Sequence, residues 1–259
     1  MNIIVCIKRV PMIQEVDLEV DGTGKDVKKD ALAYLINDWD NYAVEEAVLL
    51  QEKFGGAVTA ITIGPEDDEE ILRRALAMGA DRAIRIDPGE LDLDGFVLSR
   101  LLAGAIKDLE YDLILTGVQA DDDNAGMVGI MLGEQLGLSH AAVVTGFEPR
   151  GKEATIKVEL EGGMDEISTI GLPALLSIQT GINEPRYVSI MGIRKARQKE
   201  LKVIRVEELG LSEDDLLQRT VVEEVFLPPE TEGAEIIEGD ASKVAEEIIR
   251  ILTEKGVSL

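Results

Sequence analysis

The sequence predicts an α/β protein: an open, mostly parallel sheet with helices on both faces, followed by an antiparallel extension and a C-terminal arm that ends in a helix. Two observations support this fold class. Between residues 2 and 136, short apolar runs alternate with amphipathic segments of helical length, the pattern of parallel strands joined by crossover helices. After residue 138 the pattern changes to alternating strands separated by Gly-containing turns, which favours antiparallel pairing.

The first half of the chain is expected to hold the parallel sheet. Its strands are short and almost wholly apolar, as strands covered on both faces are, and they are predicted at 2–7, 57–63, 82–86 and 112–116. The intervening segments carry apolar residues at helical spacing, and Gly79 is a natural C-cap. These helices are predicted at 42–54, 64–79, 94–109 and 127–136. Residues 10–30 are predicted to be irregular, with a small hairpin that begins at 16–20.

The second half is expected to extend the sheet and then leave it. Antiparallel strands are predicted at 141–147, 153–160 and 164–169, and a buried strand at 172–178. A short basic segment at 190–200 reads as helical. Beyond residue 210 an acidic, Pro-containing arm (211–233) leads to an amphipathic helix at 241–254. We therefore predict an α/β domain over 1–209, whose candidate nucleotide site lies in the stretch 111–137, and an arm and helix over 210–259 that pack on a partner subunit.

Composition excludes several function classes. The chain has 259 residues and a formal charge of −25, which argues against nucleic acid or an anionic membrane surface as its partner. We expect no membrane span and no secretory leader. The single cysteine, Cys6, excludes an internal disulfide framework or a Cys-based metal site and suits a reducing cytoplasm. The only histidine, His140, is expected to be a packing residue, so neither catalytic nor metal-ligating residues are predicted.

The stretch from Tyr111 to Gly137 is the candidate ligand loop. A buried strand ends at Gly117, an acidic loop follows, and a helix begins near Met127. This arrangement aims backbone N–H groups at a bound anion, often a nucleotide phosphate. Three consecutive carboxylates would repel a phosphate, however, and Asp or Asn at a helix start is commonly only an N-cap. The residues alone leave both interpretations open.

Two further features have a structural and a functional interpretation each. Trp39, the only tryptophan, either covers the end of a helix or forms a wall against a planar ligand. The basic residues that gather in an otherwise acidic chain form either a solvated surface or a docking site for an acidic partner, and the clustering favours docking. This cluster comprises Arg186, Arg194, Lys195, Arg197, Lys199, Lys202 and Arg205.

Four stretches together resemble the β subunit of electron transfer flavoproteins. They are IIVCIKRVP, LINDWDNYAVEEAVLL, ALAMGADRAIRI with DLILTGVQADDDNAGMVG, and NEPRYVSIMGIRKARQKEL. The resemblance covers residues 1–205 in unbroken order. It implies an adenine-nucleotide α-hydrolase-like fold and a heterodimer with an α subunit that holds most of a redox-active FAD. It also implies AMP, or a second FAD in electron-bifurcating members, in the β subunit. Electrons would pass from flavin dehydrogenases, such as acyl-CoA dehydrogenase, to a quinone oxidoreductase or another acceptor.

The resemblance also implies particular site residues. Those expected to bind the nucleotide are Cys6, Lys8, Asn37, Asp38, Trp39, Asp40, Ile63, Gly64, Gln119, Ala120, Asp121, Asp122, Asp123, Asn124, Ala125, Gly126, Met127, Val128 and Gly129. The docking segment, residues 183–199, would meet the dehydrogenase through Tyr187, Ile190, Met191, Arg194, Lys195 and Arg197. The loop lacks the family's Thr and Gln, so the choice between AMP and FAD stays open. The alternative function is a nucleotide-binding sensor of the universal-stress type.

Overall fold

The computed structural model describes residues 1–14, 16–29, 32–229, 233–234 and 236–257. Within these residues, nine strands form one sheet in the order β11-β5-β4-β1-β6-β10-β7-β8-β9, and a two-stranded ribbon lies beside it. The strands from β11 to β7 are parallel, and β7, β8 and β9 are antiparallel. This is the predicted α/β fold: a mostly parallel sheet with an antiparallel extension.

The parallel part of the sheet forms where apolar runs were predicted. Strand β1 spans Ile3–Cys6, β4 spans Val58–Ile63, β5 spans Arg82–Asp87, and β6 spans Leu113–Gly117. Successive side chains of a strand point to opposite faces. Accordingly Ile3 and Val5 pack in one core, whereas Ile4 and Cys6 pack in the other.

Two pairs of helices cover the two faces. Helices α1 (Asp38–Phe54) and α2 (Glu69–Met78, after the 3-10 turn Glu66–Asp68) bury their apolar faces in the first core. Helices α3 (Gly95–Ile106) and α4 (Val128–Gln135) bury theirs in the second. Helix α1 begins four residues earlier than predicted, because Asp38 and Asp40 provide the acidic first turn that a helix N-terminus favours.

The extension consists of β7 (Ser139–Arg150), β8 (Glu153–Leu160), β9 (Met164–Gly171) and β10 (Ala174–Ile178), close to the predicted bounds. Three strands were not predicted. Strands β2 (Arg9–Pro11) and β3 (Tyr34–Ile36) form the small ribbon, and β11 (Leu201–Arg205) is a parallel edge strand beside β5. The expected hairpin after residue 16 is reduced to a single bridge between Val20 and Val27.

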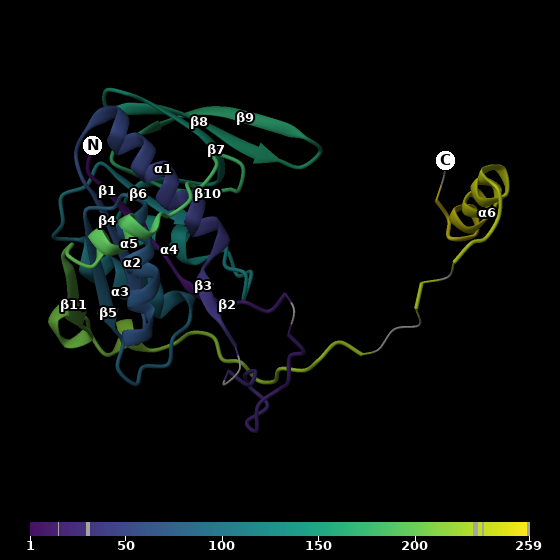
Figure 1. Cartoon of the computed structure of the whole chain (residues 1–259), viewed down its shortest axis with the longest axis horizontal. Helices are drawn as coiled ribbons and strands as arrows, with labels where there is room; N and C mark the ends of the chain where they lie inside the picture. The colour runs from purple at the N-terminus through teal and green to yellow at the C-terminus, as the bar shows by residue number, and fades with distance from the viewer. Residues whose placement is uncertain (15, 30–31, 230–232, 235, 258–259) are drawn as a thin grey trace.

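The chain leaves the α/β body after helix α5 (Ile190–Ala196), β11 and the 3-10 turn Val206–Leu209. The first part of the arm contacts its own domain: Asp215 pairs with Arg100 in a short 3-10 turn (Asp214–Leu216), and the Val225 N–H donates to Gly24 O. Helix α6 (Ala241–Glu254) has no buried residue and lies apart from the sheet (Figure 1). Residues 230–232 of the predicted arm lie outside the described residues.

Candidate functional site: a cleft at the carboxyl edge of the sheet

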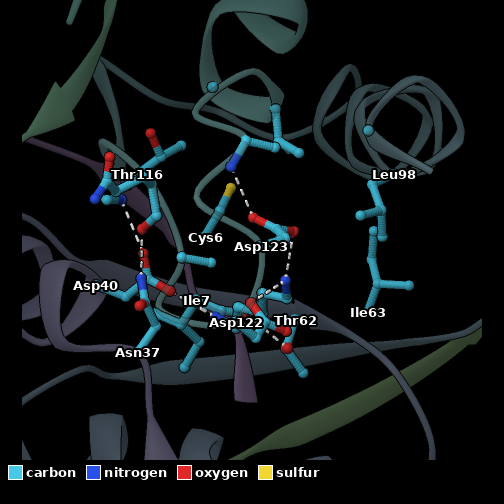
Figure 2. Close-up of a pocket in the computed structure, with 18 of the residues that line it drawn as sticks. Cys6, Ile7, Asn37, Asp40, Thr62, Ile63, Leu98, Thr116, Asp122 and Asp123 are labelled. Atoms are coloured by element: carbon cyan, nitrogen blue, oxygen red, sulfur yellow. Dashed lines mark hydrogen bonds and ion pairs between the residues drawn. The ribbon is translucent and has the colours of Figure 1, made fainter. Parts of the chain in front are cut away.

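A cleft of about 500 Å³ lies at the carboxyl ends of β1, β4 and β6 (Figure 2). Its walls come from these strand ends, the N-terminal turns of α3 and α4, and the loop between β6 and α4. Open α/β sheets bind ligands in the crevice at this edge. The cleft is therefore the candidate ligand site of the domain.

Asp40 joins two strand ends at the floor of this cleft. Its carboxylate accepts hydrogen bonds from the Lys8 N–H at 2.7 Å and from the Gly117 N–H at 2.9 Å. Burial raises the pKa of Asp40 to about 7, although the two N–H donors act in the opposite direction. A side chain at position 117 would place its Cβ 2.4 Å from an Asp40 oxygen, which explains the glycine there.

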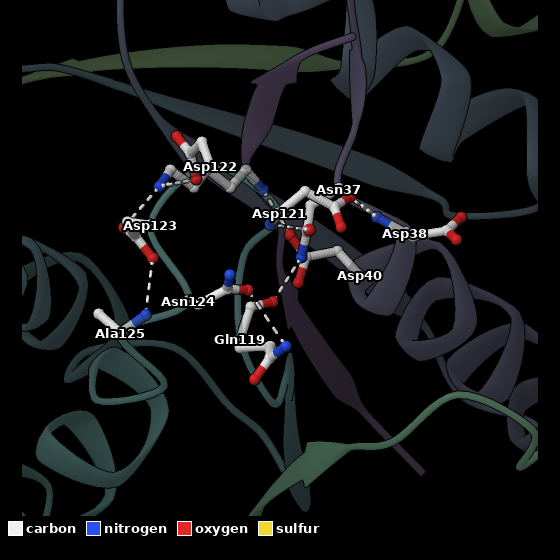
Figure 3. Close-up of polar contacts among 10 residues, drawn as sticks. Asn37, Asp38, Asp40, Gln119, Asp121, Asp122, Asp123, Asn124 and Ala125 are labelled. Atoms are coloured by element: carbon white, nitrogen blue, oxygen red, sulfur yellow. Dashed lines mark hydrogen bonds and ion pairs between the residues drawn. The ribbon is translucent and has the colours of Figure 1, made fainter. Parts of the chain in front are cut away.

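Asn37 fixes the acidic loop above the cleft. Its amide group donates to Gln119 O at 2.8 Å and accepts from the Asp121 N–H at 3.1 Å (Figure 3). The residue is 1% exposed, so this amide has no solvent to replace those partners. The start of the loop is thereby held to the start of α1, which follows Asn37 directly.

The carboxylates of the loop bind Lys8. The Lys8 ammonium lies 2.6 Å from an Asp122 oxygen and 2.9 Å from an Asp123 oxygen. Burial lowers the pKa of Lys8, but the bonds and charges of both aspartates outweigh it and raise the pKa overall. The interpretation of these acids as an N-cap is wrong, because the N-cap of α4 is Met127 and no side chain caps it. The second oxygen of Asp123 accepts from the Ala125 N–H at 2.9 Å within the loop.

Helix α4 begins directly at the cleft. A Cβ at Gly129 would lie 2.5 Å from Ser177 Oγ and 2.6 Å from Thr116 Oγ1, two hydroxyl groups that are themselves 2.9 Å apart. The glycine therefore lets the first turn of α4 approach the ends of β6 and β10. The first N–H groups of a helix have no partner within it, so they are available to an anion in the cleft.

Most of the residues expected at the nucleotide site line this cleft. These are Cys6, Lys8, Asn37, Asp40, Ile63, Gln119, Ala120, Asp122, Asp123, Ala125, Gly126, Met127, Val128 and Gly129. Cys6 is buried at the end of β1, and burial raises the pKa of its thiol, so it lines the cleft as an unreactive group.

The other expected residues lie beside the cleft and are not part of its lining. Trp39 Nε1 donates to Gln179 Oε1 at 2.8 Å, which is a packing arrangement. Gly64 O accepts from Arg85, and Asn124 has a positive φ of 50° in the loop. Asp38 is exposed in the first turn of α1, and Asp121 contributes its N–H to Asn37.

Several residues of the lining were not predicted from the sequence. Arg9 stacks on the Tyr34 ring at 4.0 Å and pairs with Asp68 at 3.4 Å, and Lys29 joins the same wall. Asp94, another residue of the lining, caps α3 by accepting from the Val97 N–H. Asp68 and Asp94 each follow the carboxyl end of a predicted strand, which is the signal that would have placed them here.

The segment predicted to dock, residues 183–199, lies outside the cleft, over α1 and α2. Tyr187, Ile190 and Met191 are 93%, 73% and 67% exposed. Arg194, Lys195 and Arg197 are exposed beside them. Arg186 and Lys199, which the sequence placed in the same basic cluster, are instead bonded to the body of the domain, Arg186 to Glu45 and Lys199 to Ala80 O.

The fold and the cleft define an open α/β protein with a polar ligand site at the carboxyl edge of its sheet, an arrangement typical of nucleotide-binding proteins. No helix among the described residues is long and apolar enough to cross a membrane. The family model described as "Electron transfer flavoprotein domain" matches residues 27–209. The chain belongs to the electron transfer flavoprotein family.

Relatives named as β subunits match nearly the whole chain. The chain is 39% identical to "Electron transfer flavoprotein subunit beta" of Bacillus subtilis over 97% of both chains, and 37% identical to the protein of that name from Methylophilus methylotrophus over 98% of both. It is 31% identical to "Protein FixA" of Azotobacter vinelandii, over 93% of this chain and 90% of that protein. The predicted resemblance to this family is confirmed.

Proposed function

We propose that this chain is the β subunit of a heterodimeric electron transfer flavoprotein. It would shuttle electrons between flavin dehydrogenases, such as acyl-CoA dehydrogenase, and a quinone oxidoreductase or another acceptor. The observation that carries the proposal is the likeness to β subunits over nearly the full length of both chains. The bound FAD would supply the redox chemistry, and this chain's residues would hold cofactors and partners in place.

The residues of the cleft fit a nucleotide. Lys8 supplies a cation and α4 supplies free N–H groups at the same edge, both suited to a phosphate. The buried Asp40 carboxylate and the Asn37 amide fix the two strand ends and the loop that surround it. Asp122 and Asp123 already accept from the Lys8 ammonium, so a phosphate would have to share its three N–H donors with these carboxylates or displace them.

Nucleotide content tests this assignment. The chain is co-purified with its candidate α subunit from the same organism, the complex is denatured, and released FAD and AMP are quantified by chromatography. One FAD and one AMP per heterodimer identify a carrier with one flavin, whereas two FAD and no AMP identify the electron-bifurcating type. A homodimer that binds ATP and takes up neither flavin nor an α subunit would refute the proposal in favour of a nucleotide sensor.

Docking is tested separately with Ile190→Asp in the heterodimer. Ile190 is 73% exposed, so the substitution disturbs no core, but it places a charge where an apolar anchor would enter a partner. We expect transfer from an acyl-CoA dehydrogenase to slow by at least about 10-fold, equivalent to about 1.4 kcal/mol, with flavin content unchanged. Ile167→Asp, at an exposed position on β9, is the matched control. An unchanged transfer rate would refute the docking assignment.

A further inference from the structure

The docking segment is fixed to α1 near its first residue. The Arg186 guanidinium lies 2.9 Å from Oε2 and 3.0 Å from Oε1 of Glu45, and the Arg186 backbone N–H donates to the same carboxylate at 3.0 Å. A second carboxylate, that of Glu52, lies 2.7 Å from Nη1. Glu45 is only 3% exposed, and a carboxylate so deeply buried needs such a partner. We call this arrangement the first clamp.

A second clamp fixes the end of the segment to α2. The Lys199 ammonium donates to Ala80 O at 2.6 Å and to Leu76 O at 3.0 Å, at the helix C-terminus where a cation is favoured. In the reverse direction, Arg73 of α2 donates to Ala196 O and Lys199 O at 3.0 and 3.1 Å. The two ends of the segment are therefore held by charged side chains on two neighbouring helices.

The part between the clamps is also ordered locally. Ser189 caps α5 by accepting from the Gly192 N–H at 3.1 Å. A Cβ at Gly192 would lie 3.2 Å from Ala77 O, so α5 packs directly on α2. Ala196 is buried at 1% exposure on the inner side of α5. The apolar tip (Tyr187, Ile190 and Met191) and the three cations (Arg194, Lys195 and Arg197) are left on the outside.

We propose that Arg186 and Lys199 are positioning residues that hold the docking segment in one conformation before a partner arrives. The inference rests on the proposed function, since it assumes that this segment docks. A surface already ordered loses less side-chain and loop freedom on association, so it binds more tightly for the same contacts. Glu45 and Glu52 neutralise the charge of Arg186. The electrostatic attraction between this segment and an acidic partner therefore comes from the three exposed cations. The partner surface that fits is an apolar pocket with carboxylates at its rim.

Arg186→Gln in the αβ complex tests the first clamp, with Arg186→Lys as the conservative variant. Two quantities are measured: amide hydrogen exchange over residues 187–198, and steady-state transfer from an acyl-CoA dehydrogenase as the carrier concentration varies. We expect exchange to accelerate about 10-fold and the apparent KM for the carrier to rise about 5- to 10-fold, with kcat and flavin content unchanged. Arg186→Lys should give a smaller change. Glu52→Gln is the matched control, because the buried bonds to Glu45 remain.

The outcomes separate this proposal from the docking assignment. Unchanged exchange in Arg186→Gln would show that the clamp does not order the segment. Faster exchange with an unchanged KM would show that order is irrelevant to docking, and either result overturns the proposal. If Ile190→Asp also leaves KM unchanged, the docking assignment itself fails. Should Arg186→Gln not fold, Lys199→Gln applies the same measurements to the second clamp.

Discussion

The Asp40 carboxyl offers a sharp test of the cleft's electrostatics. Burial raises its pKa from 3.8 to about 7, while hydrogen bonds from two backbone N–H groups favour the ionised form. Asp40→Asn keeps the shape of the side chain but removes the titration. Its amide NH₂ group would also face an N–H donor, a pH-independent cost of about 1–3 kcal/mol that adds to the pH-dependent difference between the two proteins.

The sign and size of the pH effect follow from linkage. Between pH 3.8 and about pH 7 the folded wild-type protein keeps a proton on Asp40 that the unfolded chain has released. The free energy of unfolding therefore falls by about 1.4 kcal/mol per pH unit, or about 4 kcal/mol in all. This stability is fully present below the unfolded pKa and is lost as the pH rises through the folded pKa. The difference in unfolding free energy, wild type minus Asp40→Asn, should fall by that amount over the whole window, and by about 3 kcal/mol between pH 4.5 and pH 7.

Urea unfolding of the nucleotide-free chain from pH 4.5 to 8.5 measures this difference. Trp39, the only tryptophan in the sequence, reports unfolding by its fluorescence from the position next to Asp40. Asp38→Asn, at an exposed site in the same helical turn, is the control and should run parallel to wild type. If the Asp40→Asn and wild-type curves are also parallel, the carboxyl is ionised throughout, and the N–H donors outweigh burial.

Three further predictions concern packing. Gly129→Ala should lower the free energy of unfolding by about 1–3 kcal/mol, because the added Cβ would clash with Ser177 and Thr116. Gly171→Ala is the control: its Cβ would meet nothing within 4 Å, so the same urea titration should show almost no change. Leu132→Ala should lower the free energy of unfolding by about 2–5 kcal/mol, since Leu132 is 0% exposed in the core under α4. A smaller loss would mean that neighbouring side chains move in to fill the cavity. Removal of α6 should leave the stability of the single chain unchanged and weaken co-purification with the α subunit, because the helix buries none of its residues here.

The sequence predicted those strands and helices that can be recognised from their own residues, without knowledge of the segments that pack on them. The apolar runs that became β1, β4 and β6 needed no partner to be recognised, since strands covered on both faces are apolar throughout. Helix α6 was predicted with its bounds because its stripe of apolar residues is uninterrupted. In the structure Asp240 caps its start by accepting from the Lys243 N–H. Strand β11 was missed because it is an edge strand with several exposed positions, so its alternation of Lys, Val and Arg resembles a surface loop.

The candidate site also has features that the sequence predicts and features that only the fold reveals. That a ligand loop would follow β6 could be predicted from the sequence, because the carboxyl ends of parallel strands meet at one edge. That Asp122 and Asp123 would bind Lys8, more than a hundred positions away, could not be predicted. A carboxylate's choice between a helix N-terminus and a distant ammonium depends on which lies nearer in space, and only the fold sets that distance.

The sequence by itself determined the apolar strands of the sheet, the long helices, the edge of the sheet that carries the loop, and the family. Only the tertiary structure decided which charges are free. Arg186 and Arg194 look alike in the sequence, yet one is bound by the buried Glu45 and the other is exposed. The physical reason is that residue type and spacing fix the face on which a side chain lies, whereas its partner, its burial and its effective charge depend on segments that fold against it.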